Sequence, residues 1–313
     1  MAVEHTRAAL GRLPLVQSDD SQRMWMEPIE IQEAFQKQPA FIRPESKTLW
    51  WTVAASLLPS LYFAHSILPR FRDDSEGPSE AMLRFQVSCL AWLSAASALT
   101  SLFLAAYRNP GVVPTQLRGA PACVPSRNIV VNGVKISQKY CQTCRIYRPL
   151  RSKHCSSCGR CIFRYDHHCP WLGNCIGLGN YRTFLGLIAT SALFFTHATV
   201  ITCKVLGGRY AQQQHDFSIE ATSVWMVLWR VSANSVPEAS FLIVSSVLSL
   251  ALMILVLYHS YLMGANLTTN EHIRGYYDDS GNPFNEGCVT NLEQVVCMPY
   301  GNPLLDLQVC PKA

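Results

Sequence analysis

Four long apolar stretches constrain the fold of this 313-residue chain more than any other feature. None of them contains Lys, Arg, Asp or Glu, and they cover residues 49–68, 85–107, 184–203 and 241–263. A helix of about 20 apolar residues crosses the hydrocarbon core of a bilayer, which is roughly 30 Å thick. The composition agrees, because 49% of the residues are hydrophobic and only 15% are charged. We therefore expect an all-α polytopic membrane protein with four transmembrane helices.

Lys and Arg are distributed unevenly among the segments that flank and connect these stretches. Four crossings return the chain to its starting side, so the leader, the long central loop and the tail share one side. That side holds 20 of the 26 Lys and Arg residues, and short loops rich in these residues stay in the cytosol. The expected parts are a cytosolic leader at 1–48, spans 1 and 2 at 49–107, a cytosolic cysteine-rich domain at 108–183, spans 3 and 4 at 184–263, and a cytosolic tail at 264–313.

The central loop concentrates side chains that bind metal ions. Seven of the 13 cysteines and three of the nine histidines lie between positions 141 and 175. They occur as Cys141-x-x-Cys144, His154-Cys155-x-x-Cys158-x-x-Cys161, His167-His168-Cys169 and Cys175. Tetrahedral zinc takes four Cys or His ligands, commonly supplied as close pairs. Disulfides are the alternative, but no segment of signal-peptide character opens the chain and the cytosol is reducing, so zinc is favoured.

The number of candidate ligands is itself informative. The ten Cys and His side chains of this loop are two more than a pair of closed four-ligand zinc sites would use. One His and one Cys are therefore in surplus, and a His beside a Cys can generate a thiolate nucleophile. Spacing predicts that Cys141 and Cys144 belong to one site and Cys155 and Cys158 to another. Spacing alone does not say which residues complete each site.

Several motifs resemble those of the DHHC family of protein S-acyltransferases, also called palmitoyltransferases. The signature is Asp166-His167-His168-Cys169, preceded by the cysteine spacing above and followed by Pro170-Trp171 and Asn174-Cys175-Ile176-Gly177. The run Thr268-Thr269-Asn270-Glu271 is similar to the family's TTxE motif, and residues 291–297 (NLEQVVC) are similar to its C-terminal motif. The resemblance covers the four spans, the cysteine-rich loop and part of the tail. One departure is Asn109-Pro110-Gly111, where many members have Asp-Pro-Gly.

The resemblance implies a ligand set for each of two structural zinc ions. The first set is Cys141, Cys144, His154 and Cys161, and the second is Cys155, Cys158, His168 and Cys175. Four protein ligands leave no open position on the metal, so the role of both ions is expected to be structural. His167 and Cys169 remain as the surplus pair.

The resemblance also implies a two-step, ping-pong reaction. Cys169 would take a long-chain acyl group from acyl-CoA, typically palmitoyl-CoA, and pass it to cysteine thiols of membrane-associated substrate proteins. His167 would accept the thiol proton, and Asp166 would orient the imidazole and stabilise its positive form. Thr269 is expected to donate a supporting hydrogen bond to Asp166, and Asn291 to fasten the tail against the helices. The alternative is that Cys169 is a spare thiol and Asp166 a surface carboxylate.

The expected surroundings of this protein follow from the same features. The family favours the Golgi or endoplasmic reticulum membrane, with a possible accessory subunit, and the net charge of +5 does not call for nucleic acid. The basic residues of the loop are expected either to contact CoA phosphates or lipid headgroups or to form a solvated face. They are Arg145, Arg148, Arg151, Lys153, Arg160, Arg164 and Arg182.

Two other classes of function are compatible with parts of the sequence. A non-catalytic membrane adaptor would use the zinc-bound loop to recruit partners. A transporter would place His197, in the third apolar stretch, along its pathway, although a histidine hydrogen-bonded inside the helix bundle explains this residue as well. The spans otherwise lack the charged or interrupted segments typical of transporters, so the acyltransferase is favoured.

Overall fold

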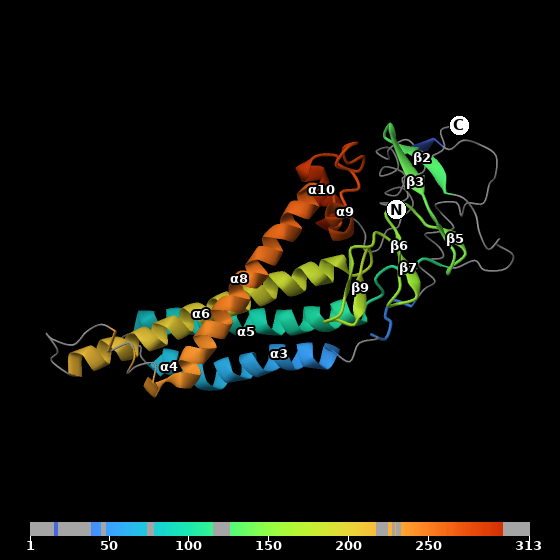
Figure 1. The fold of residues 1–313 in the computed structure, drawn as a ribbon. Coiled ribbons are helices and arrows are strands. Elements are labelled where there is room, and N and C mark those ends of the chain that lie inside the picture. The colour runs from blue at the N-terminus through green and yellow to red at the C-terminus, as the bar shows by residue number, and fades with distance from the viewer. Residues whose placement is uncertain are drawn as a thin grey trace, which may run out of the picture. The chain divides into compact units, whose positions relative to one another are not determined.

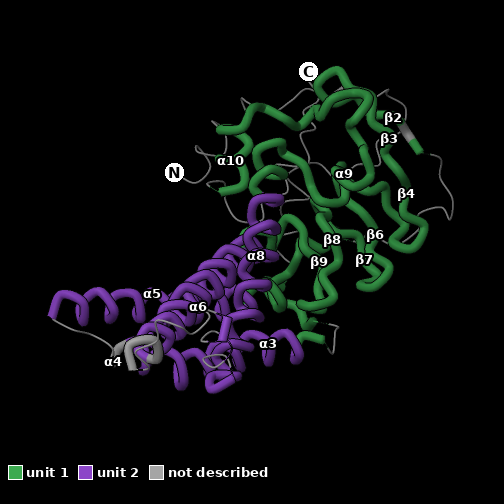
Figure 2. The backbone as a smooth tube through the Cα atoms, turned by 60° about the vertical axis from the view of Figure 1, so that its left-hand side comes forward, with its two compact units in different colours: residues 1–49, 104–182, 260–313 green, residues 50–103, 183–259 purple. Residues whose placement is uncertain are grey.

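The computed structural model describes residues 16–17, 39–44, 48–73, 78–114, 126–216, 225–226, 229 and 233–296. Most of the leader expected at 1–48, and the tail beyond Val296, lie outside the described residues. The chain forms two compact units, shown in different colours in Figure 2. Unit 1 comprises Met1–Leu49, Leu104–Arg182 and Ser260–Ala313, and unit 2 comprises Trp50–Phe103 and Thr183–His259.

The prediction of four apolar helices is confirmed in the part of the chain that the structure describes. Helices that are long and apolar enough to cross a membrane cover Thr48–Phe71, Pro78–Tyr107, Tyr181–Gln212 and Val236–Gly264. In Figure 1 they are α3 (Thr48–Tyr62) with its continuation, α5 (Pro78–Tyr107), α6 (Tyr181–Asp216) and α8 (Val236–Gly264). Each is longer than the uncharged stretch that predicted it, because the helical hydrogen bonding continues into polar residues at the ends.

The first of these helices changes its winding after a proline. Pro59 lies inside α3, which is followed by a π-helical turn, η1 (Phe63–Ile67), and by α4 (Leu68–Asp73). Proline removes one backbone donor and clashes with the preceding turn, so irregular winding close to it is expected. The π-helical turn accordingly begins four residues after Pro59.

Unit 2 has an aromatic core that joins all four helices. It contains Phe63 and Ile67 of η1, Ala91 and Ala95 of α5, Phe194 and Ile201 of α6, and Phe241 of α8. Two side-chain hydrogen bonds, Thr196–Ser249 at 2.8 Å and Thr199–Ser245 at 3.1 Å, connect α6 to α8. Small hydroxyl residues of this kind allow close helix packing in membranes.

Unit 1 contains short strands, which corrects the expectation of an all-α protein. One antiparallel sheet has the order β1 (Val16–Gln17), β2 (Arg127–Val131), β3 (Val134–Gln138). Three two-stranded hairpins follow: β4 (Tyr140–Cys141) with β5 (Ile146–Tyr147), β6 (Lys153–Cys155) with β7 (Arg160–Ile162), and β8 (His167–Cys169) with β9 (Asn174–Ile176). These hairpins carry the metal-ligand motifs. A hairpin places two side chains directly opposite each other on one face, which a pair of ligands to one ion requires.

Another part of unit 1 is formed by the segment that follows α8. It contains the short helices α9 (Thr269–Ile273) and α10 (Cys288–Val296). Asn266 lies between α8 and α9 with φ of 48°, the left-handed conformation that commonly ends a helix. This segment supplies several side chains to the site described next.

Candidate functional site

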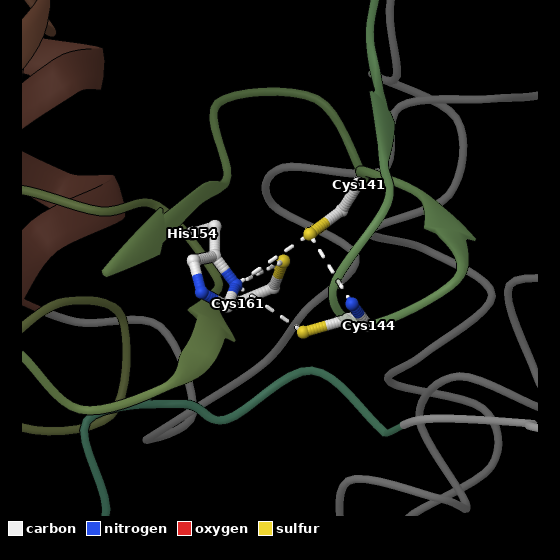
Figure 3. A group of neighbouring side chains, drawn as sticks. All are labelled: Cys141, Cys144, His154 and Cys161. Carbon is white, nitrogen blue, oxygen red and sulfur yellow. Dashed lines mark hydrogen bonds between the residues drawn. The ribbon is translucent and has the colours of Figure 1, made fainter. Parts of the chain in front are cut away.

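Four side chains from two hairpins form the first Cys/His cluster, shown in Figure 3: Cys141, Cys144, His154 and Cys161. The Nδ1 atom of His154 lies 3.5 Å from Cys141 Sγ, 3.3 Å from Cys144 Sγ and 3.8 Å from Cys161 Sγ. Ligands of a tetrahedral zinc ion with ordinary Zn–S and Zn–N bonds are separated by about 3.6 Å. The first cluster therefore fits a zinc site.

The second cluster has the same composition: Cys155, Cys158, His168 and Cys175. His168 Nδ1 lies 3.6 Å from Cys155 Sγ, 3.4 Å from Cys158 Sγ and 3.6 Å from Cys175 Sγ. In both clusters all four ligand atoms lie within 4.8 Å of one another. The second cluster also fits a zinc site.

The register of the hairpins explains why the two clusters alternate along the chain. His154 pairs with Cys161 across β6 and β7, and His168 pairs with Cys175 across β8 and β9. Successive residues of a strand point to opposite faces. Cys155, next to His154, therefore faces away from the first cluster and contributes to the second.

The thiols of the first cluster need a cation in order to ionise together. Burial raises the pKa of the Cys161 thiol, and the nearby Cys141 and Cys144 thiolates raise it further. Burial is likewise the largest cause of the raised pKa of Cys144. A divalent ion reverses this effect because it stabilises the thiolate form.

Cys169 belongs to neither cluster. It is the last residue of β8, two positions after His167, so the two side chains share the face opposite to that of His168. The Cys169 residue is only 7% exposed. The strand thus separates the His168 imidazole, which faces the metal ligands, from the His167 and Cys169 pair.

His167 is held by Asp166. His167 Nδ1 lies 2.7 Å from Asp166 Oδ2, and Asp166 is buried. A carboxylate can only accept, so Nδ1 carries the hydrogen and the second ring nitrogen, Nε2, is left for the thiol. Burial lowers the pKa of His167, but hydrogen bonds and charges from Asp166 and Cys169 outweigh it and raise the pKa to about 9. The imidazole is therefore a strong acceptor for the thiol proton.

Comparison with known proteins identifies the segment that carries this geometry. Residues 134–276 match the family model described as DHHC palmitoyltransferase. This matched segment, residues 134–276, is the DHHC domain of the chain. The family resemblance drawn from the sequence is thereby confirmed.

Curated relatives of this chain carry names of the same kind. It is 30% identical over 272 residues to "Probable protein S-acyltransferase 5" of Arabidopsis thaliana, an alignment that covers 81% of this chain and 54% of the relative. "Protein S-acyltransferase 8" of Arabidopsis thaliana is 30% identical over 275 residues, with 81% and 64% covered. "Palmitoyltransferase ZDHHC18" of Homo sapiens is 35% identical over 190 residues, with 58% and 45% covered. The chain thus matches about half to two thirds of the length of these relatives.

In the DHHC domain, Thr269 also binds Asp166, through two hydrogen bonds. The backbone N–H of Thr269 donates to Asp166 Oδ1 at 2.7 Å, and its hydroxyl donates to Asp166 Oδ2 at 2.8 Å. Thr269 is the first residue of α9, which begins with a capping box between Thr268 and Glu271. The hydrogen bond expected between the Thr269 side chain and Asp166 is present. The second bond, from the Thr269 backbone N–H, was not expected from the motif.

Asn291 lies just beyond the matched segment and is fully buried. Its Nδ2 donates to the carbonyl of Gly264 at 2.7 Å and to Asn285 Oδ1 at 2.7 Å, while its Oδ1 accepts from the N–H of Glu286 at 3.0 Å. Gly264 is the last residue of α8. Asn291 therefore connects α10 to the end of α8.

The side chain of Asn109, at the departure from the family's Asp-Pro-Gly pattern, forms hydrogen bonds through both its oxygen and its nitrogen. Its Oδ1 accepts from the N–H groups of Gly111 and Val112, both at 3.0 Å. Its Nδ2 donates to the carbonyl of Pro39 at 3.0 Å. An aspartate could accept the first two bonds but could not donate the third.

Sequence reasoning missed the role of one basic residue of the DHHC domain. Arg151 was expected either to contact phosphates or to be solvated, but its side chain is only 1% exposed and pairs with Glu271. The structure contradicts both expectations for Arg151. The only available signal was the unexplained glutamate of the TTxE motif, because nothing local to Arg151 distinguishes it from the other arginines of the loop.

Proposed function

We propose that this protein is a protein S-acyltransferase that transfers a long-chain acyl group, such as palmitoyl, from acyl-CoA to cysteine thiols of membrane-associated proteins. The observation that carries the proposal is that Cys169 lies outside both metal clusters, on the same strand face as a histidine oriented by Asp166. The DHHC domain and the names of the relatives support the same activity. The catalytic roles of Cys169, His167 and Asp166 are part of this proposal.

In the first step, Cys169 becomes acylated. His167 takes the thiol proton, and the Cys169 sulfur attacks the carbonyl carbon of the acyl-CoA thioester. A new C–S bond forms to Cys169, the C–S bond to CoA breaks, and the CoA sulfur leaves with the proton from His167. Asp166 stabilises the imidazolium that exists between these proton transfers.

In the second step, a substrate cysteine repeats the same exchange. Its thiol proton passes to His167, its sulfur attacks the thioester on Cys169, and the Cys169 sulfur leaves and regains the proton. One thioester replaces another in each step, so the reaction needs no external energy source. The histidine ends each cycle in the form in which it began.

The membrane is proposed to supply the site for the acyl chain. Each buried methylene contributes about 0.8 kcal/mol, so a chain of some fourteen methylenes gains roughly 11 kcal/mol as an upper bound. Trp171, two residues after Cys169, is 65% exposed, and tryptophan is enriched at membrane interfaces. We propose that Cys169 lies at the cytosolic interface, so that the acyl chain of the substrate enters the apolar part of the membrane while CoA stays in water.

The two metal clusters are proposed to be structural zinc sites. Zinc, when bound, would join the hairpins of a region that has a small apolar core. The orientation, with the zinc domain and both termini in the cytosol, rests on the distribution of Lys and Arg. Location in the Golgi or endoplasmic reticulum membrane and the use of an accessory subunit remain proposals from the family resemblance.

The proposed activity is tested with the purified full-length chain in detergent and labelled palmitoyl-CoA. The wild-type protein should gain one label per chain that neutral hydroxylamine releases, as a thioester requires. Cys169→Ser should gain none, while metal analysis still finds about two zinc ions per chain. Equal hydroxylamine-sensitive labelling of both proteins would overturn the assignment of Cys169. A folded wild-type protein without any label would instead favour the non-catalytic adaptor, which the comparisons do not favour.

A further inference from the structure

We propose that Arg151 and Glu271 are positioning residues of the acyl transfer, acting on His167 through Thr269 and Asp166. This inference rests on the proposed function and adds to it a buried ion pair from outside the signature residues. Arg151 belongs to none of the sequence motifs described above. The sequence predicted only that the basic residues of this loop contact phosphates or solvent.

The ion pair joins the cysteine-rich region to the segment after α8 with bidentate geometry. Arg151 Nε donates to Glu271 Oε1 at 2.8 Å, and Arg151 Nη2 donates to Glu271 Oε2 at 2.7 Å. The two side chains are 1% and 2% exposed. Parallel hydrogen bonds of this kind fix the carboxylate in one orientation, which a single flexible ammonium group does not do.

The Arg151 guanidinium donates two further hydrogen bonds, both to Asn266. Nη1 donates to Asn266 Oδ1 at 2.9 Å and Nη2 to the Asn266 carbonyl at 2.9 Å, while the Phe284 ring lies 4.7 Å below the guanidinium carbon. Asn266 in turn donates to the Phe284 carbonyl at 2.7 Å. A buried charge that donates at least four hydrogen bonds is held in one position, so this pair is a rigid connection.

Glu271 also caps the N-terminus of helix α9. Its Oε2 accepts from the N–H of Thr268 at 2.9 Å, and its own N–H donates to Thr268 Oγ1 at 3.2 Å. This reciprocal pair is a capping box. The same carboxylate therefore fixes both Arg151 and the backbone at the start of α9.

The start of α9 is the part of the molecule that holds Asp166. Thr269 follows Thr268 directly and donates to both oxygens of Asp166, and Asp166 Oδ2 also accepts from His167 Nδ1. Arg151 reaches the same place through its backbone, because its carbonyl accepts from the N–H of Tyr165 at 3.1 Å. A change at the ion pair is thus transmitted to the orientation of the imidazole.

The consequence for the reaction is a loss of rate without loss of acyl-CoA binding. Asp166 is buried, and the direction of its Oδ2 sets the plane in which His167 faces the thiol of Cys169. A small rotation of the carboxylate misaligns the proton transfer, which depends steeply on geometry. Arg151 itself touches neither thiol nor imidazole among the described contacts.

The test is a double-mutant cycle between Arg151→Lys and Asp166→Asn, read as the single-turnover rate of Cys169 acylation at saturating palmitoyl-CoA. Arg151→Lys keeps the charge but loses the bidentate bonds, and we expect its rate to fall about 10- to 100-fold, with an unchanged KM for palmitoyl-CoA. In the Asp166→Asn background the same substitution should cost less than about 3-fold, because its route to His167 is already broken. Labelling followed over hours makes the slow rates measurable.

The matched control is Arg274→Lys. Arg274 is an exposed arginine of the same domain, at the C-terminal end of α9. Its substitution should leave the saturated rate unchanged. Zinc content near two per chain shows that each variant is folded. If Arg151→Lys loses zinc, Glu271→Gln replaces it in the cycle, since glutamine preserves the capping box but removes the charge.

Two outcomes would overturn the inference while leaving the proposed function intact. One is an equal fold-loss from Arg151→Lys with and without Asp166, which indicates a general effect on the fold. The other is a wild-type rate in both Arg151→Lys and Glu271→Gln. A wild-type protein that never becomes acylated would instead refute the proposed function itself.

Discussion

His154 and Cys155 are neighbours in strand β6, yet their side chains belong to different metal clusters. The strand forces this arrangement, because adjacent residues point to opposite faces. The two clusters therefore share a hairpin and cannot be treated as independent. His167, His168 and Cys169 in β8 repeat the arrangement, with the metal ligand on one face and the proposed catalytic pair on the other.

Removal of a ligand from the first cluster should therefore affect both clusters. Cys144→Ser replaces one of four ligands of the first cluster, and we expect the zinc content to fall from about two ions per chain to one or fewer. Cys169 acylation should fall with it, because hairpin β6–β7 also supplies the second cluster. Metal analysis of the purified variant measures this. A variant that keeps one zinc ion and full activity would show that the clusters are independent.

Loss of the proposed base should reduce the rate without loss of metal. His167→Gln keeps a polar side chain but cannot accept and return a proton, and we expect Cys169 acylation to slow by about 100- to 10,000-fold. The zinc content should stay near two, since His168, on the opposite face, supplies the ligand. Single-turnover labelling measures the acylation rate, and metal analysis measures the zinc content. An unchanged rate would exclude His167 as the base.

The hydroxyl of Thr269 can be tested separately from its backbone N–H. Thr269→Val retains the shape and the N–H bond to Asp166 but loses the 2.8 Å hydroxyl bond. A hydrogen bond to a charged group contributes about 1.5–3 kcal/mol, so the acylation rate should fall roughly 10- to 100-fold. Thr269→Ser keeps the hydroxyl and serves as the control with a rate close to wild type. Equal acylation rates for Thr269→Val and Thr269→Ser would show that the hydroxyl does not contribute to the rate.

Asn291 is expected to matter for stability. Asn291→Ala removes a fully buried side chain and, with it, the hydrogen bonds to Gly264, Asn285 and Glu286. The expected cost is about 2–4 kcal/mol in the free energy of unfolding. Val289→Ala, on the exposed part of the same helix α10, is the control with little effect. Thermal unfolding of the two variants in detergent gives the comparison, and similar midpoints would contradict the prediction.

Close backbone contact in the loop after β9 should make one glycine irreplaceable. A Cβ at Gly179 would collide with the Asn109 carbonyl and lie 2.9 Å from the N–H of Gly111. Gly179→Ala should therefore yield little folded, zinc-loaded protein. Gly207→Ala, where a Cβ meets nothing within 4 Å, is the control and should fold normally. The yield of zinc-containing protein distinguishes the two, and equal yields would show that the loop can move aside.

The local part of this architecture was predictable from the sequence. The four apolar helices follow from stretches without charged side chains, and the Cys pairs that begin each metal cluster follow from short spacings. The residues that complete each cluster were expected from the family resemblance. The surplus of one His and one Cys came from counting alone. The all-α expectation failed in the hairpins, because ligand spacings do not specify that strands of two or three residues carry the ligands.

Only the tertiary structure decided which distant side chains hold the proposed catalytic pair. Arg151 and Glu271 are 120 residues apart, and neither has a local pattern that points to the other. Thr269 was expected near Asp166 through the family motif, yet its backbone bond and the capping box beside it depend on where α9 begins. The spacing of residues along a short segment determines which side chains share a face of a strand or of a helix. The pairing of buried charges depends on which segments pack together, and that is set by the folded chain as a whole.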